Sequence, residues 1–238
     1  MDKTLGWNTE EYSLSVTAGS VMLEGNLAVP PLAQSVVLFA HGSGSSRYSP
    51  RNRYVAHKLR EAGMATLLID LLTADEEAID LRTKHQLRLD INFLASRLIG
   101  ITDWLKKNPL TQNFRIGYFG ASTGSGAALV AAAERPDVVD AIASRGGRLD
   151  LAIASLQHVQ APTLLIVGGN DMPIIEMNQQ ALAHLRTQKH LEIIPGATHL
   201  FQEPGALDEV ARLTSQWFKR YLAPVVGQDL HQHEMSLN

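Results

Sequence analysis

The sequence predicts an α/β protein in which helices cover both faces of a mostly parallel central sheet. From residue 36 onward, short apolar runs of strand length alternate with longer stretches of helical period. The apolar runs are continuous rather than alternating, which is typical of strands buried on both faces. A regular alternation of strands and helices indicates a parallel sheet with helices on either side.

Eight strands are expected along the chain. The first two, at 12–17 and 20–29, are joined by a turn at Ala18 and Gly19 and should form an antiparallel hairpin at one edge of the sheet. The other six are expected at 36–40, 65–70, 115–119, 138–143, 163–167 and 191–194.

The clearest helix lies at 87–105, where apolar residues recur every three or four positions. Asn108 and Pro109 should end it, because a residue before proline disfavours helix. Other helices are expected at 50–63, 123–134, 175–186 and 207–221. The segment 71–86 reads as a loop that shields one side of the site. The short stretch between 146 and 163 leaves no room for a cap domain, so the site should be shallow.

Length and composition bound the class of protein. The chain has 238 residues, which fits a single domain at 1–223 followed by a flexible tail at 224–238. Lys and Arg number 21 and Asp and Glu number 24, giving a net charge of −3, so the chain lacks the basic surface of a nucleic-acid binder. The absence of cysteine excludes a disulfide framework, a zinc–thiolate site and a cysteine nucleophile.

The sequence also predicts where the protein works. The N-terminus has no apolar stretch followed by a cleavage site, and the longest apolar runs, 36–40 and 127–133, are far too short to cross a bilayer. We therefore expect a cytoplasmic protein with no membrane partner, no metal and no cofactor. His231, His233 and Glu234 in the tail are expected to be solvated rather than metal ligands, because nothing near them fixes a geometry.

Chemistry is expected where the strands end, because ligands of open α/β sheets bind at the carboxyl ends of the strands. The strand at 115–119 is followed by Gly120, Ala121, Ser122, Thr123 and Gly124, a G-x-S-x-G pattern, and then by a helix rich in small residues. A sharp turn between strand and helix exposes the serine hydroxyl above the sheet, and the glycines relieve the crowding that the turn causes. Ser122 is the expected nucleophile.

A serine hydroxyl needs a base, and the base needs an orienting acid. Of the histidines after Ser122, only His199 falls in a loop directly after a strand. Asp171 occupies the corresponding position after the preceding strand, in a glycine-rich turn. Each residue also has a plainer interpretation: Ser122 as a helix N-cap, His199 as a structural loop residue and Asp171 as a self-satisfied turn residue.

Four segments together carry a family resemblance: HGSGSS at 41–46, GASTG at 120–124, GGND at 168–171 and GATH at 196–199. The chain resembles the α/β-hydrolase fold and is most similar to its small, lid-less dienelactone hydrolase branch. The resemblance extends from residue 21 to 221 and implies a triad of Ser122, Asp171 and His199. It departs in the nucleophile, which is cysteine in dienelactone hydrolase proper.

The same resemblance implies an oxyanion hole and a function. The backbone N–H of Thr123 would be one donor, and that of Ser43, or else Gly44, the other. His41 should be a buried residue that shapes this loop rather than a base. The implied function is a serine hydrolase of the carboxylesterase type, which cleaves small esters or lactones through an acyl-enzyme on Ser122.

Three points stay open. Arg145 and Arg148, at a strand end, are candidates for gripping a substrate carboxylate, or they form ordinary ion pairs with carboxylates such as Asp150. The same fold also serves acyltransferases, perhydrolases and non-catalytic ligand-binding relatives. The oligomeric state and the physiological substrate do not follow from the sequence.

Overall fold

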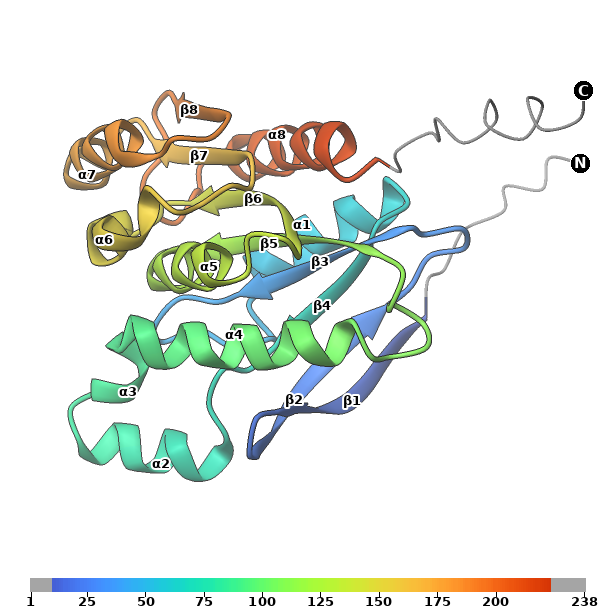
Figure 1. Cartoon of the computed structure of the whole chain (residues 1–238). Helices are drawn as coiled ribbons and strands as arrows, with labels where there is room; N and C mark the ends of the chain where they lie inside the picture. The colour runs from blue at the N-terminus through green and yellow to red at the C-terminus, as the bar shows by residue number, and fades with distance from the viewer. Residues whose placement is uncertain (1–9, 224–238) are drawn as a thin grey trace, which may run out of the picture.

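An eight-stranded sheet forms the centre of the computed structural model, which describes residues 10–223 (Figure 1). The strands are β1 (Glu11–Ala18), β2 (Val21–Ala28), β3 (Ser35–Ala40), β4 (Ala65–Ile69), β5 (Arg115–Ala121), β6 (Val139–Arg145), β7 (Thr163–Gly168) and β8 (Lys189–Ile194). Their spatial order is β1-β2-β4-β3-β5-β6-β7-β8. The β1–β2 and β2–β4 pairs are antiparallel and all the others are parallel, which confirms a mixed sheet with an N-terminal hairpin at one edge. The predicted tail at 224–238, with His231, His233 and Glu234, lies outside the described residues.

Helices cover both faces of the sheet and make three layers (Figure 1). Their bounds are α1 (Pro50–Glu61), α2 (Ala74–Arg82), α3 (Gln86–Leu89), α4 (Ile91–Leu105), α5 (Thr123–Glu134), α6 (Ile153–Leu156), α7 (Met172–His184) and α8 (Ala206–Tyr221), with a 3-10 turn at Leu149–Ala152. Apolar side chains of α4 and α5 share one core with one face of the sheet. Those of α1 and α8 form a second core on the other face.

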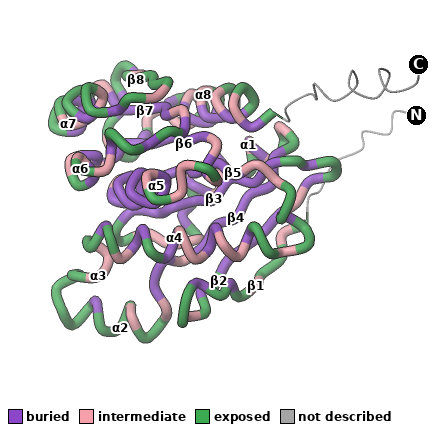
Figure 2. Tube along the Cα trace, in the orientation of Figure 1, coloured by how far each residue is buried: buried purple, intermediate pink, exposed green. Residues whose placement is uncertain are grey.

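Helix α5 is the most deeply buried helix and it follows the strand that carries the candidate nucleophile. Every residue from 123 to 132 is buried, and Figure 2 shows α5 buried along almost its whole length. Such burial requires small side chains, because the helix axis must approach the sheet closely. The run of glycine, serine and alanine at 124–128 meets this requirement.

Two local features differ from the sequence prediction. The predicted loop at 71–86 contains α2, which begins with a capping box: Thr73 Oγ1 accepts the N–H of Glu76, and the Glu76 carboxylate accepts the N–H of Thr73. The helix predicted at 87–105 is split into α3 and α4. Asp90 has extended backbone angles and its side chain accepts the Phe93 N–H at 3.0 Å, so it starts α4 as an N-cap.

The buried carboxylate of Asp80 stabilises the connection between α2 and α3. Asp80 is fully buried and accepts the backbone N–H groups of Leu87 at 2.8 Å and Arg88 at 3.1 Å. It also pairs with the Arg88 guanidinium and lies 3.2 Å from His85 Nδ1. Burial alone would raise the pKa of Asp80, but the hydrogen bonds from Arg88 and His85 outweigh it and hold the pKa below its ordinary value.

Within residues 10–223, no helix combines the length and the apolar character that crossing a bilayer requires.

Candidate active site

Ser122 sits in a sharp turn between β5 and α5. Its backbone angles are φ 52° and ψ −120°, a conformation that non-glycine residues rarely adopt. The turn is held from both sides: the Ser122 N–H donates to the Arg145 carbonyl at 3.1 Å, and the Ser122 carbonyl accepts from Ser125 and Arg148. Strained positions of this kind persist only where the surroundings over-determine them, and they cluster at functional sites.

The two glycines of the motif allow this turn to form. A Cβ on Gly124 would lie 2.1 Å from the Ala40 carbonyl oxygen, and a Cβ on Gly120 would lie 2.4 Å from Ser125 Cα. Both neighbours are backbone atoms that cannot move aside cheaply. The turn therefore requires glycine at both positions, as the sequence motif implies.

The Ser122 side chain does not cap the helix that it precedes. Ser122 occupies the N-cap position of α5 but makes no side-chain capping hydrogen bond. A serine serving as an N-cap would accept the N–H of the second or third helical residue. This geometry disfavours the N-cap interpretation and leaves the Ser122 hydroxyl available.

The structure brings Asp171 and His199 together, as the sequence analysis predicted. Asp171 Oδ2 lies 2.6 Å from His199 Nδ1. Asp171 stands at the N-cap of α7 without capping it, so the interpretation as a self-satisfied turn residue does not fit. The Asp171 side chain is 13% exposed and that of His199 is 39% exposed, so the imidazole stays open to solvent on one side.

Close packing of the loops after β7 and β8 creates this contact. The N–H of Asn170 donates to the Ala197 carbonyl at 2.9 Å, and its side-chain amide donates to the Gly196 carbonyl at 2.9 Å. A Cβ on Gly168 would lie 2.4 Å from the Ala197 carbonyl oxygen. The glycine at 168 thus lets the two loops approach, and the approach sets Asp171 against His199.

His199 also lies against the end of β6, beside the Ser122 turn. A Cβ on Gly146 would lie 3.2 Å from His199 Cε1, and Gly146 has a φ of 56°. The carbonyl oxygen of the preceding residue, Arg145, accepts a hydrogen bond from the Ser122 N–H. One short segment therefore contacts both the base candidate and the nucleophile candidate. In the sequence, this segment stood out for its arginines, and the role of Gly146 was missed, although a Gly-Gly pair directly after a strand is a signal.

The loop after β3 is packed against the nucleophile turn. A Cβ on Gly42 would lie 3.1 Å from Ser122 Cβ, so a side chain there would crowd the serine. The next residue, Ser43, donates its N–H to Thr123 Oγ1 at 2.8 Å. Gly44 has a φ of 75°, and a Cβ on it would meet no atom within 4 Å. The predicted oxyanion residues thus lie together, but the Ser43 N–H already has an acceptor.

His41 anchors the base of this loop. Its Nε2 accepts the N–H of Leu71 at 3.2 Å, so the proton must be on Nδ1, which lies 3.0 Å from the Gly42 carbonyl oxygen and donates to it. His41 is 8% exposed, and burial lowers its pKa in spite of that carbonyl acceptor. His41 is therefore a neutral residue that joins β3, the segment after β4 and the loop, as predicted.

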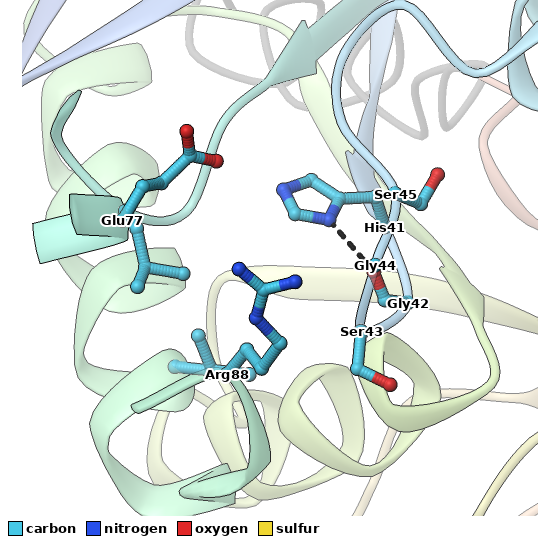
Figure 3. Close-up of a pocket in the computed structure, with 9 residues that line it drawn as sticks. His41, Gly42, Ser43, Gly44, Ser45, Glu77 and Arg88 are labelled. Carbon is cyan, nitrogen blue, oxygen red and sulfur yellow. Dashed lines mark hydrogen bonds between the residues drawn. The ribbon is translucent and has the colours of Figure 1, made fainter. Parts of the chain in front are cut away.

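A small cavity lies beside the loop, and Figure 3 shows the Arg88 guanidinium pointing into it, across from His41 and beside Glu77. Its volume open to water is about 10 Å³, which is room for roughly one water molecule. The cavity is therefore too small to hold a substrate, and it separates α2 and α3 from the oxyanion residues.

The two arginine candidates have different surroundings. Arg148 forms a two-point ion pair with Asp150 at 2.9 and 2.8 Å and is partly exposed. Arg145 is 8% exposed and donates to Asn52 Oδ1 at 3.2 Å, and its buried Nη1 finds no hydrogen-bond partner in the described part of the chain. Burial and then the nearby Arg51 lower the pKa of Arg145 to about 10.

Among the residues that the structure describes, no three His, Asp or Glu side chains gather as they would to hold a metal ion.

Comparisons with known proteins place these features in context. Residues 23–222 match the sequence model of the dienelactone hydrolase family. A dienelactone hydrolase from Anabaena variabilis is 66% identical, with a TM-score of 0.88 over 90% of this chain and 99% of that chain. Est1E from Butyrivibrio proteoclasticus is 15% identical, with a TM-score of 0.74 over 87% and 98% of the two chains, a likeness that shows the fold alone.

A relative from Mycobacterium tuberculosis carries a different name. It is provisionally called a phosphoribosyl transferase and is 54% identical over 212 residues. The match covers 89% of this chain but 47% of the relative. The chain thus spans about half the length of the curated relatives that it matches.

Proposed function

The chain belongs to the dienelactone hydrolase family, and on that premise we propose that it is a serine hydrolase that cleaves carboxylic esters or lactones of small molecules. The observation that carries the proposal is the Asp171–His199 hydrogen bond of 2.6 Å, at the edge of the sheet where Ser122 stands in its sharp turn without capping α5. Family membership supports a hydrolase in general, and this contact supports a serine mechanism in particular.

Each residue of the candidate site has its own role in the proposed reaction. Ser122 Oγ attacks the carbonyl carbon of the ester while His199 Nε2 takes the hydroxyl proton. The carbonyl oxygen becomes an oxyanion beside the backbone N–H of Thr123. The imidazolium then gives its proton to the leaving alcohol, and the C–O bond breaks to leave an acyl-enzyme. His199 then deprotonates a water molecule that attacks the acyl carbon. The imidazolium returns this proton to Ser122 Oγ as the bond between Oγ and the acyl carbon breaks, which releases the acid and restores the enzyme.

Asp171 has an orienting role in this scheme. Because its carboxylate can only accept, His199 must carry a proton on Nδ1, which leaves the Nε2 lone pair free to act as the base. The negative charge of Asp171 also stabilises the imidazolium that forms during each attack.

The residues that would contact the substrate are less well defined than those that would carry out the reaction. Of the two arginine candidates, Arg145 remains the proposed contact for a substrate carboxylate, because it has no carboxylate partner within residues 10–223, whereas Arg148 pairs with Asp150. The transferase name of the mycobacterial relative belongs to a protein of which this chain matches 47%, so we carry no transferase activity over from it.

Covalent labelling tests the proposal. A fluorophosphonate probe should add one adduct, and peptide mass spectrometry should place it on Ser122. Ser122→Ala should remove the adduct and lower kcat toward p-nitrophenyl esters by up to about 10⁶-fold. An unlabelled wild-type protein would favour a non-catalytic relative. An Ala variant with full activity would contradict the assigned nucleophile.

Product analysis separates hydrolysis from acyl transfer. With an ester substrate in water containing a small alcohol or hydrogen peroxide, a hydrolase should release mainly the free acid. A transferase or perhydrolase should instead give mainly the new ester or the peracid, because these activities differ in which nucleophile attacks the acyl-enzyme.

A further inference from the structure

The side chain of Thr123 occupies an unusual position between the two predicted oxyanion donors. Thr123 is 3% exposed, and its Oγ1 accepts the Ser43 N–H at 2.8 Å. A threonine hydroxyl can accept hydrogen bonds and also donates one proton. Within residues 10–223, Thr123 Oγ1 has no acceptor for that proton at hydrogen-bond distance.

The residue that holds this unused proton is the chain neighbour of the candidate nucleophile. Thr123 directly follows Ser122, and a Cβ on Gly42, the residue before Ser43, would lie 3.1 Å from Ser122 Cβ. The Ser43–Thr123 hydrogen bond therefore lies beside the candidate nucleophile. The Thr123 N–H belongs to the first turn of α5 and has no intrahelical acceptor. The positive end of the α5 dipole adds to the attraction for an anion at this point.

We propose that the γ-hydroxyl of Thr123 is a side-chain donor of the oxyanion hole, an inference that rests on the proposed function. The hydroxyl accepts from Ser43 and donates its own proton to the substrate carbonyl oxygen as that oxygen becomes negative. No covalent bond to Thr123 forms or breaks, and the proton stays on Oγ1. The Ser43 N–H then contributes indirectly, because it donates to the Thr123 hydroxyl, which in turn donates to the oxyanion. Two hydrogen bonds linked in this way polarise and strengthen each other.

This arrangement differs from the expectation for Ser43. The second oxyanion donor was expected to be the Ser43 N–H, or else that of Gly44, but the Ser43 N–H is already bonded to Thr123 Oγ1. Thr123 thereby supplies two donors to the oxyanion from one residue, its backbone N–H and its hydroxyl.

Three variants test the inference. Thr123→Val keeps the shape and removes the hydroxyl, whereas Thr123→Ser keeps the hydroxyl. Thr214→Val is the matched control, because Thr214 is fully buried in α8 and its hydroxyl has no hydrogen-bond partner among residues 10–223. For each variant, kcat and KM toward p-nitrophenyl acetate and the rate constant of fluorophosphonate labelling are measured, with the melting temperature as a check of folding.

The Val variant should lose about 10²–10³-fold in kcat, the usual effect of removing one oxyanion donor, with little change in KM. Its labelling by fluorophosphonate should slow as well, because the P=O oxygen occupies the same hole. Thr123→Ser and the Thr214→Val control should stay near the wild type. If the Val variant does not fold, Thr123→Ala makes the same comparison with a smaller side chain.

Some outcomes would overturn the inference about Thr123, and one would overturn the proposed function itself. Wild-type kcat in Thr123→Val, a faster Val variant, or a Ser variant as slow as the Val variant would each overturn the inference. So would Ser122 labelling that proceeds in Thr123→Val at the wild-type rate. An unlabelled wild-type protein would overturn the proposed function, and the inference would fall with it.

Discussion

Asp171 Oδ2 lies 2.6 Å from His199 Nδ1, although 28 positions separate the two residues in the chain. The Asp171 carboxylate is available to the imidazole, because it does not cap its own helix. The two residues also come from different loops, which separates their contact from an ordinary surface pair such as His190 and Glu192, two positions apart in β8 at 3.0 Å.

Asp171→Asn should lower kcat by about 10⁴-fold, the loss found when a triad aspartate becomes an amide. The introduced side-chain amide would donate to His199 Nδ1 and move the imidazole proton to Nε2, which then has no lone pair for Ser122. Glu192→Gln is the matched control and should leave kcat unchanged. The measurement is kcat toward a p-nitrophenyl ester, and wild-type rates in Asp171→Asn would assign the orienting acid elsewhere.

The two arginines should differ in their effect on substrate choice. Arg145→Met should reduce the preference for an acidic over a neutral ester by about 10-fold or more, because a charge-assisted hydrogen bond contributes roughly 1.5–3 kcal/mol. Arg148→Met should not, because Arg148 is held by Asp150. The measurement is kcat/KM for a matched pair of esters. Equal preference in both variants and the wild type would remove both arginines from substrate binding.

The same variants should differ in stability. A buried guanidinium with one neutral partner and a like charge nearby is costly, and an apolar side chain of similar volume is often neutral or stabilising in its place. Arg145→Met should therefore keep or raise the melting temperature. Arg148→Met should lower it slightly, since partly exposed ion pairs contribute about 0–1 kcal/mol. A large drop in Arg145→Met would show that the guanidinium serves the fold.

Stability should fall in mild acid because of His41. Its pKa is lowered in the folded protein, so the unfolded chain binds a proton first as the pH falls. The free energy of unfolding should be constant above about pH 6.5, the ordinary histidine value, and decline below it. Urea titrations from pH 5 to 8 measure this slope. His41→Gln should flatten it, and His57→Gln, which changes an exposed residue of α1, should not.

The α2–α3 connection should open when its buried carboxylate is lost. Asp80→Asn removes the charge that holds Arg88, so backbone amides at 83–90 should exchange hydrogen faster while those of α5 stay protected. Because the pKa of Asp80 is lowered, its contribution is present above the ordinary aspartate value and is lost as the pH falls through the folded value. Unchanged exchange at 83–90 would contradict this role.

The sequence predicted the sheet well because its central strands are buried on both faces. Strands such as β3 and β7 are continuous apolar runs, and continuous runs are easy to recognise. Helix α2 was missed because its first turn carries Asp75, Glu76 and Glu77 and it has little apolar periodicity. The Thr73–Glu76 capping box was visible in the sequence and would have located its start.

The sequence could nominate the residues of the candidate site but not the distances between them. The alternation of strands and helices, with the rule that ligands bind at the carboxyl ends of the strands, placed Ser122, Asp171 and His199 at the same edge of the sheet. The Asp171–His199 distance depends on how two loops pack through Gly168, which no local pattern encodes. The Ser43–Thr123 hydrogen bond likewise joins segments 80 positions apart. The Arg148–Asp150 pair, two positions apart, was one of the two alternatives that the sequence left open.

The positive φ of Ser122 has a consequence for how the chain would change if its activity were no longer needed. Glycine adopts this conformation freely, whereas alanine carries the same strain as serine, of order 1–3 kcal/mol. Ser122→Gly should therefore melt at a higher temperature than Ser122→Ala, although both abolish the nucleophile. A lineage released from selection for activity would gain stability by replacing this serine with glycine. Serine at this turn therefore lowers the stability of the fold relative to glycine.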